Sequence, residues 1–89
     1  MIAMEVTVRG KVQGVFYRAS AKAKADEWGL WGWVKNEPDD SVVIWVEGPE
    51  IEVLQFIDWC WMGSGRARVE DVSVKVVERQ FYKDFEVIR

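Results

Sequence analysis

The feature that most constrains the fold is the order in which two hydrophobic periodicities alternate along the chain. Over residues 2–8 the even positions are apolar and mostly polar side chains fall between them, the period of two typical of a strand with one buried face. Over residues 19–28 the period changes, because Ala21, Ala25 and Trp28 share one face of a helix. The chain is therefore predicted to open with a strand, a loop and a helix.

A hairpin and a second helix are predicted next. Residues 30–35 and 42–47 are rich in aromatic and β-branched side chains, and the turn-forming residues 36–41 separate them. Gly48 and Pro49 predict a helix start, with Gly48 as the N-cap and Pro49 as the first helical residue. The apolar face of this helix is expected to consist of Val53, Leu54, Phe56, Ile57, Cys60 and Trp61.

Two more β-prone runs complete the pattern. In residues 69–78 the side chains of Val72, Val74 and Val76 are predicted to face the interior, and residues 85–89 form a short closing strand. The order β-α-β-β-α-β with one extra strand predicts an α+β ferredoxin-like (split βαβ) sandwich, in which two helices cover one face of an antiparallel sheet. No linker divides the 89 residues, so a single domain over residues 1–89 is expected.

The same topology predicts a site at one edge of the sheet. In the usual form of this arrangement the third strand lies between the first and the second and is antiparallel to both. The first two strands then end at the same edge, two strand spacings or about 10 Å apart. The loop 10–17 leaves one of these strand ends and Asn36 leaves the other, while Arg18 begins the helix beside them. A glycine-containing loop, a helix N-terminus, an arginine and an amide are thus expected together.

The charge order of the first helix bears on what this site binds. Arg18 and Lys22 lie near the partially positive end of the helix, and Asp26 and Glu27 lie near the negative end. Each placement opposes the helix dipole by roughly a few tenths of a kcal/mol. A bound anion would reverse the cost for Arg18, since exposed N–H groups and a guanidinium both suit phosphate oxygens. These residues alone leave two interpretations, an anion site or a solvated arginine.

Composition removes several classes of function. One cysteine and no histidine exclude an intrachain disulfide, a cysteine-based zinc site and histidine-dependent catalysis. The net charge of −3 argues against general binding to nucleic acids or anionic membranes. No apolar run approaches the roughly 20 residues that cross a bilayer, and the N-terminus lacks the basic segment of a signal peptide. We expect a cytoplasmic monomer that binds neither nucleic acid nor membrane.

Two motifs at the predicted site resemble those of the acylphosphatase family. The segment GKVQGVFYR, Gly10–Arg18, is similar to the family signature G-[RK]-V-Q-G-V-x-[FY]-R. The segment GLWGWVKN, Gly29–Asn36, is similar to the signature G-L-x-G-W-V-x-N. A weaker third element, Ala67-Arg68-Val69, precedes the fourth strand, and the similarity extends over essentially the whole chain.

The resemblance implies an enzyme that hydrolyses acyl phosphates to a carboxylate and inorganic phosphate without metal or cofactor. By position, Arg18 would bind the phosphoryl group and Asn36 would orient the attacking water. The main-chain N–H groups that would also bind the phosphoryl group are those of Gln13, Gly14, Val15, Phe16 and Tyr17. A chain without histidine suits this reaction, because a carboxylate is a good leaving group and phosphoryl transfer depends mainly on positioning and charge stabilisation.

Two segments depart from the family pattern. Asp39-Asp40 stands where the hairpin turn usually reads Asp-Gly, so we expect another type of turn, with both carboxylates solvated rather than paired for metal or acid–base work. Gly63-Ser64-Gly65 replaces a glycine–proline pair and predicts a looser loop. Cys60, between two tryptophans, is interpreted as a packed thiol.

Two other functions are compatible with the predicted fold. A non-catalytic domain could hold phosphate or a carbamoyl-phosphate-like metabolite for a partner enzyme. Alternatively, Trp31, Trp33 and Trp45 of the hairpin could stack on RNA bases. The acidic composition and the absence of an RNP1-like motif favour packing of these tryptophans instead. A hydrolysis assay with a chelator present separates the enzyme from the binding domain.

Overall fold

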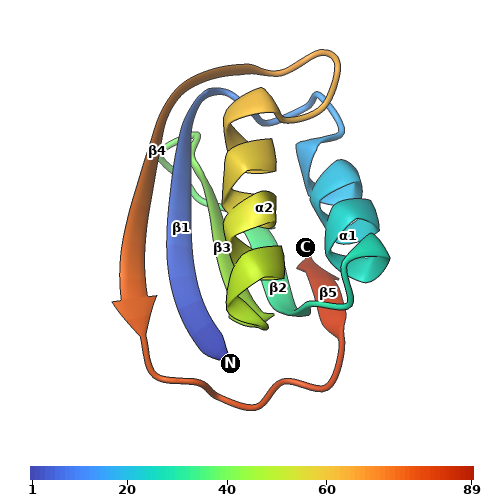
Figure 1. Ribbon diagram of the computed structural model, residues 1–89. Helices are drawn as coiled ribbons and strands as arrows, with labels where there is room; N and C mark the ends of the chain where they lie inside the picture. Colours follow the sequence, from blue (N-terminus) through green and yellow to red (C-terminus); the bar gives the residue numbers. More distant parts are fainter.

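The computed structural model describes residues 1–89, which form five strands and two helices in the predicted order (Figure 1). The elements are β1 (Ile2–Lys11), α1 (Tyr17–Glu27), β2 (Trp31–Asn36), β3 (Val42–Gly48), α2 (Glu50–Met62), β4 (Arg68–Val77) and β5 (Phe85–Ile88). Only the end of β1 lies well away from its predicted position, because this strand stays paired with β4 as far as Lys11. Neither helix is long and apolar enough to cross a bilayer.

The strands form one sheet in the order β4-β1-β3-β2-β5. As the predicted topology requires, β3 lies between β1 and β2 and is antiparallel to both. The fifth strand differs from the expectation of a wholly antiparallel sheet, since β5 pairs with β2 in parallel. The reason is the connection over residues 78–84, which carries the chain from one edge of the sheet to the other before β5 begins (Figure 1).

Both helices pack on the same face of the sheet, where they enclose the core (Figure 1). Val6 and Ile44 face this layer from neighbouring strands and are fully buried. Ala21 and Ala25 of α1 are also fully buried, and their small side chains let this helix approach the sheet closely. The ring of Phe56, from α2, is fully buried in this core, with its centroid 6.0 Å from that of Phe85 in β5. Burying such a side chain contributes about 1.5–3 kcal/mol to stability.

The start and the buried face of α2 differ from the prediction. The N-cap is Pro49, whose carbonyl accepts the N–H of Val53 at 3.0 Å, so the helix begins one residue later than expected. Leu54 and Trp61, predicted to be buried, are 47% and 51% exposed. Trp59 is buried instead, with its ring centroid 5.3 Å from that of Tyr17 in α1. Because α2 is apolar around most of its surface, the sequence pattern did not reveal which arc contacts α1.

The prediction that the alternating valines of β4 face the interior is wrong. Val76 is 75% exposed, Val74 is also exposed, and Val72 is only partly buried. The reason is the position of β4 at the edge of the sheet, outside the pair of helices in Figure 1. A period of two shows that alternate side chains share a face, but it does not show that the face is covered.

The other face of the sheet carries the tryptophans of the hairpin. The rings of Trp33 and Trp45 stack with centroids 6.2 Å apart, and the indole N–H of Trp33 donates to the hydroxyl of Tyr82 at 3.2 Å. Beside them the fully buried carboxylate of Glu47 accepts the main-chain N–H groups of Gln80 and Phe81. The tryptophans therefore pack against the connection between β4 and β5, as the interpretation of packed side chains predicted.

Candidate active site

A cavity of about 410 Å³ lies at the edge of the sheet where β1 and β2 end. Arg18 and Asn36 both line it, so the structure brings together the two side chains that the topology was predicted to gather. Gly14, Phe16 and Tyr17 line the same cavity from the loop and the start of α1. The remaining lining residues are Val12, Ala19, Val87 and Arg89.

The loop between β1 and α1 places main-chain N–H groups beside this cavity. From Gln13 to Ala19 no main-chain N–H donates to a backbone carbonyl, and the first turn of α1 has no capping side chain. Gly14 and Phe16 both have the left-handed conformation, with φ of 72° and 64°. Left-handed residues within a loop turn successive N–H groups toward one side, which creates a concave anion site. The loop is therefore a set of donors without a partner from the protein backbone.

The entry to the loop depends on Gly10. Its φ is 127°, and the register of pairing between β1 and β4 shifts between Arg9 and Gly10. A Cβ at this position would collide with the backbone carbonyl of Arg68. No residue with a side chain fits there without moving β4, so Gly10 explains how β1 bends into the loop.

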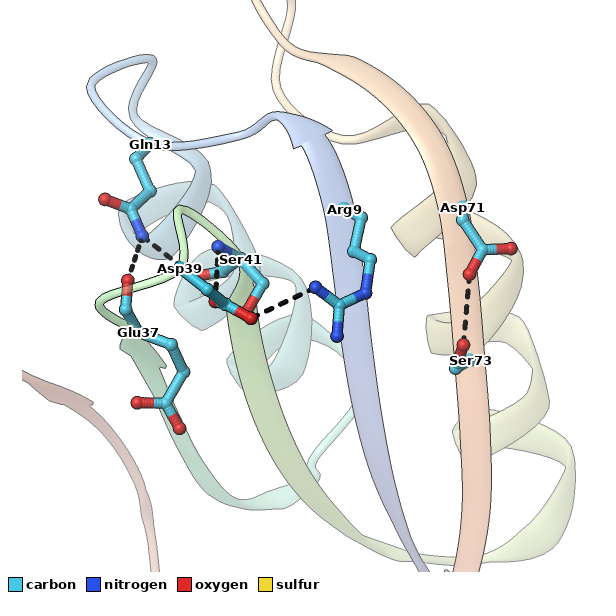
Figure 2. Close-up of polar contacts among 7 residues, drawn as sticks. All are labelled: Arg9, Gln13, Glu37, Asp39, Ser41, Asp71 and Ser73. Atoms are coloured by element: carbon cyan, nitrogen blue, oxygen red, sulfur yellow. Dashed lines mark hydrogen bonds and ion pairs between the residues drawn. The ribbon is translucent and has the colours of Figure 1, made fainter.

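Gln13 was predicted to contribute its main-chain N–H, and its side chain proves to have a second task. Its Nε2 donates to the carbonyls of Glu37 and Ser41, each at 2.8 Å, as Figure 2 shows in part. These carbonyls belong to the turn that follows Asn36, so the Gln13 side chain joins the loop to the neighbour of Asn36. Local sequence patterns gave no signal for this contact, because the partners lie 24 and 28 residues away.

The turn between β2 and β3 is held by hydrogen bonds around Asp39 (Figure 2). Its carboxylate accepts the main-chain N–H and the hydroxyl of Ser41, and it contacts Arg9 at 3.1 Å. These bonds from Ser41, followed by the one from Arg9, lower the pKa of Asp39 to about 2. Asp40 follows in the left-handed conformation with φ of 73°. The two aspartates are therefore turn-forming residues, and Asp39 is ionised at neutral pH.

The loop over residues 63–65 is better held than its composition predicted. The hydroxyl of Ser64 donates to the carbonyl of Val15 at 2.6 Å, and the Ser64 carbonyl accepts the N–H of Ala67 at 3.0 Å. Gly63 packs so closely on the ring of Tyr17 that a Cβ there would lie 2.7 Å from Cε2. Ser64, which departs from the family pattern, thus links the loop over residues 63–65 to Val15 in the loop before α1.

The basic residues of α1 contact β5. Nη1 of Arg18 donates to the carbonyl of Ile88 at 3.0 Å, and Nζ of Lys22 donates to the carbonyl of Phe85 at 2.9 Å. Lys22 also forms an ion pair with Asp26 at 3.0 Å, which explains its place on the helix without any ligand. Arg18 has no such carboxylate partner. One of its five N–H donors is engaged by Ile88, and the others remain for the cavity.

The charges around the cavity favour an anion. Arg18 and Arg89 are the charged side chains that line it, and no carboxylate side chain does. The first turn of α1 contains no acidic residue, whereas the first turn of α2 contains Glu50 and Glu52. No acidic side chain in the first turn of α1 therefore compensates the partial positive charge of this helix end, although the protein as a whole is acidic.

Asn36 brings a polar atom that the protein leaves unsatisfied. Its Oδ1 is buried and has no hydrogen-bond partner. Leaving a buried acceptor unpaired costs about 1–3 kcal/mol. The side chain is held at the last residue of β2, where Asn36 pairs with Val42 of β3. This rigid placement is suited to orienting a small ligand such as water.

Tyr17 and Cys60 support the site without taking part in its charge. The Tyr17 hydroxyl donates to the main-chain carbonyl of Cys60 at 2.9 Å. Burial raises the pKa of the Tyr17 hydroxyl far above its usual value and raises the pKa of the Cys60 thiol to about 12. Both groups stay protonated at neutral pH. The interpretation of Cys60 as a packed thiol is confirmed.

Comparisons with known proteins show the family to which this sequence and fold belong. The acylphosphatase family model matches residues 4–87. A curated acylphosphatase of Haloquadratum walsbyi is 48% identical over 84 residues, which cover 94% of this chain and 90% of that protein. The crystal structure of an acylphosphatase from Bacillus subtilis is 34% identical, with a TM-score of 0.97 and full coverage of both chains. An acylphosphatase structure from Coxiella burnetii is 38% identical, with a TM-score of 0.95 over 98% of this chain and 92% of that one. With sequence, structure and family model in agreement, the chain belongs to the acylphosphatase family.

Proposed function

We propose that this acylphosphatase hydrolyses its acyl phosphate by in-line attack of a water molecule on a phosphoryl group bound in the cavity of Arg18 and Asn36. The observation that carries the proposal is the convergence, in one cavity, of a guanidinium, a helix start without a cap and an unpaired amide oxygen. The helix start and the amide oxygen have no partner within the fold, and only one N–H donor of the guanidinium is engaged, by the carbonyl of Ile88.

Arg18 and the loop bind the phosphoryl oxygens. The guanidinium presents N–H donors in a planar fork that fits two oxygens of a phosphate, and it stays charged at any physiological pH. The loop supplies the main-chain N–H groups of Gln13, Gly14, Val15, Phe16 and Tyr17. These donors are already in place before the reaction, so charge that develops in the transition state is stabilised without reorganising the protein.

Asn36 orients the nucleophile. Its Oδ1 accepts a hydrogen bond from water, which aims the water oxygen at phosphorus on the side opposite the acyl oxygen. A bond forms between this oxygen and phosphorus, and the bond from phosphorus to the acyl oxygen breaks. The electron pair leaves with the carboxylate, and the water proton passes to a phosphate oxygen. The carboxylate is a weak base, so no general acid has to protonate it.

The reaction needs only groups from one chain. Arg18, Asn36, Gly14, Phe16 and Tyr17 line the same cavity, and Gln13 and Val15 lie in the loop beside it, so a monomer is the proposed active form. We assign the reaction to the cytoplasm, because the free thiol of Cys60 is compatible with a reducing compartment. The substrate is a small acyl phosphate and the product is inorganic phosphate, and neither a nucleic acid nor a membrane takes part.

Steady-state hydrolysis of benzoyl phosphate with EDTA present tests the proposal. Wild type is expected to turn over, and Asn36→Ala should reduce kcat by about 10²-fold while inorganic phosphate still inhibits with an unchanged Ki. Asp40→Asn is the matched control, because residue 40 lies in the same turn, outside the cavity, and asparagine tolerates its left-handed conformation.

Two results would contradict this assignment. Full activity of Asn36→Ala would remove the role of Asn36 in orienting water. Tight phosphate binding by wild type with no turnover of any acyl phosphate would favour a non-catalytic phosphate-binding domain on the same fold.

A further inference from the structure

Phe16 is a large apolar side chain that the fold leaves uncovered beside the cavity. It is 70% exposed and lines the cavity together with Val12 and Val87. The neighbouring Tyr17 provides a contrast, since its ring is buried and packs 5.3 Å from that of Trp59. The aromatic ring pairs found in the protein do not include Phe16. Packing of the core therefore does not explain a phenylalanine at this position.

The backbone of Phe16 makes the choice of side chain more notable. Its φ of 64° and ψ of 22° lie in the left-handed region, at the N-cap of α1. Bulky residues adopt this conformation at a cost, whereas glycine and asparagine adopt it readily. Strained residues of this kind occur preferentially at ligand-binding positions. The aromatic ring of Phe16 thus lies at the cavity although its exposure to water and its left-handed backbone conformation are both unfavourable.

We propose that Phe16, with Val87 of the same cavity, binds the acyl group and makes this enzyme selective for acyl phosphates with an aromatic or bulky apolar acyl group. The inference rests on the proposed function, which places the phosphoryl group against the loop and Arg18. In the bound substrate the acyl group then extends from the phosphoryl site past Phe16. An apolar acyl group there covers ring surface that water otherwise contacts.

A charged acyl group is the competing possibility. Arg89 lines the same cavity and would contact a second carboxylate on the substrate. The Arg89 side chain is exposed, however, and an ion pair in solvent contributes little to binding. The apolar surface of Phe16 and Val87 provides the larger driving force, so the apolar acyl group is favoured.

The test compares kcat/KM for benzoyl phosphate and acetyl phosphate in wild type, Phe16→Ala and Phe16→Leu. Phe16→Ala should lower kcat/KM for benzoyl phosphate about tenfold more than kcat/KM for acetyl phosphate, mostly through KM. Phe16→Leu should fall between the two. Dividing each variant by wild type cancels the intrinsic reactivities of the substrates. The Ki of inorganic phosphate should stay unchanged, which shows that the phosphoryl site is intact.

Ile51→Ala is the matched control, because Ile51 is equally exposed, at 70%, but lies on α2 away from the cavity. Equal losses with both substrates, or no loss with either, would overturn the inference. A preference of wild type for succinyl monophosphate that Arg89→Ala abolishes would overturn it as well. If wild type hydrolysed none of these substrates, the proposed function itself would fail, whereas hydrolysis without discrimination at residue 16 would refute only the role of Phe16.

Discussion

Two concave sets of main-chain N–H groups in this protein use the same local geometry and differ in what fills them. At one, Phe81 has a φ of 60°, and the N–H groups of Gln80 and Phe81 donate to Glu47 at 2.5 and 3.0 Å. Arg79 lies 3.6 Å from the same carboxylate. At the other, Phe16 has a φ of 64°, the loop N–H groups donate to no backbone carbonyl, and no acidic side chain lines the cavity beside them. Arg18 stands beside them as Arg79 stands beside Glu47.

The first set of N–H groups has its acceptor, Glu47, within the chain. Burial raises the pKa of Glu47, but the hydrogen bonds from Gln80, Trp45 and Phe81 and the charge of Arg79 outweigh it, so the pKa lies below its usual value. The anion that completes this set belongs to the chain, and it fixes the connection between β4 and β5. The loop before α1 offers an equivalent environment to an anion from outside. A site is recognised here by donors whose acceptor the fold does not supply.

The largest effect is expected at Arg18, where the phosphoryl group is proposed to bind. Arg18→Gln should reduce kcat/KM for benzoyl phosphate by at least about 10³-fold, because the guanidinium stabilises charge that develops on the phosphoryl group. Lys22→Ala is the control, since Lys22 also donates to a carbonyl of β5 but does not line the cavity. Its activity should remain within about twofold of wild type. Equal losses in the two variants would mean that Arg18 acts by holding β5.

Substitution of Glu47, the acceptor of the N–H groups of Gln80 and Phe81, should instead change stability. Glu47→Gln should lower the free energy of unfolding by about 3 kcal/mol at pH 7, because it replaces a buried acceptor of several hydrogen bonds by an amide with two donors. The activity of the folded fraction should remain. Urea unfolding and kcat measured on the same samples test this, with the exposed Glu86→Gln as control. A loss of activity without loss of stability would break the comparison.

The same variant carries the pH dependence. The pKa of Glu47 is lowered in the folded state, so its contribution to stability is fully present above the unfolded value near 4.5 and is lost as the pH falls through the folded pKa. Wild-type stability should therefore decline below pH 4.5, and that of Glu47→Gln should decline less steeply. Parallel curves from pH 7 to pH 3 would show that Glu47 is not the titrating group.

A smaller effect is expected at Gln13, whose side chain links the loop before α1 to the turn after Asn36. Gln13→Ala removes two hydrogen bonds to the turn after Asn36 and should reduce kcat about tenfold, with KM and the Ki of phosphate changed little. A positioning role predicts this division between kcat and KM, whereas simple loosening of the loop would weaken phosphate binding too. Gln13→Glu, which retains the length of the side chain but not the donors, should resemble the alanine variant.

The smallest effect is expected at α2, whose first turn contains the acidic residues Glu50 and Glu52. Replacing both Glu50 and Glu52 by glutamine should cost α2 less than about 1 kcal/mol per residue and leave activity unchanged. Thermal shifts on addition of inorganic phosphate should remain in this double variant and disappear in Arg18→Gln. A phosphate shift that depended on the start of α2 would place the anion at the wrong helix.

Much of this protein was predictable because its determinants are local. The order of elements follows from periodicities within a few residues, and the motifs GKVQGVFYR and GLWGWVKN flank the strand ends that the topology brings together. The burial of Leu54, Trp61 and Val76 was predicted wrongly, since burial depends on which neighbour covers a residue. Trp59 was missed for the same reason, because its partner Tyr17 lies in the other helix.

By itself the sequence determined the strands and helices, and it predicted the sheet edge at which Arg18 and Asn36 line one cavity, because hydrophobic period and strand direction are properties of short segments. Only the tertiary structure decided which donors are already satisfied. Glu47 reaches Gln80 across 33 residues and Gln13 reaches Ser41 across 28, contacts that no local pattern encodes. In the loop before α1, by contrast, the main-chain N–H groups of residues 13–19 donate to no backbone carbonyl, and no acidic side chain lines the cavity beside them.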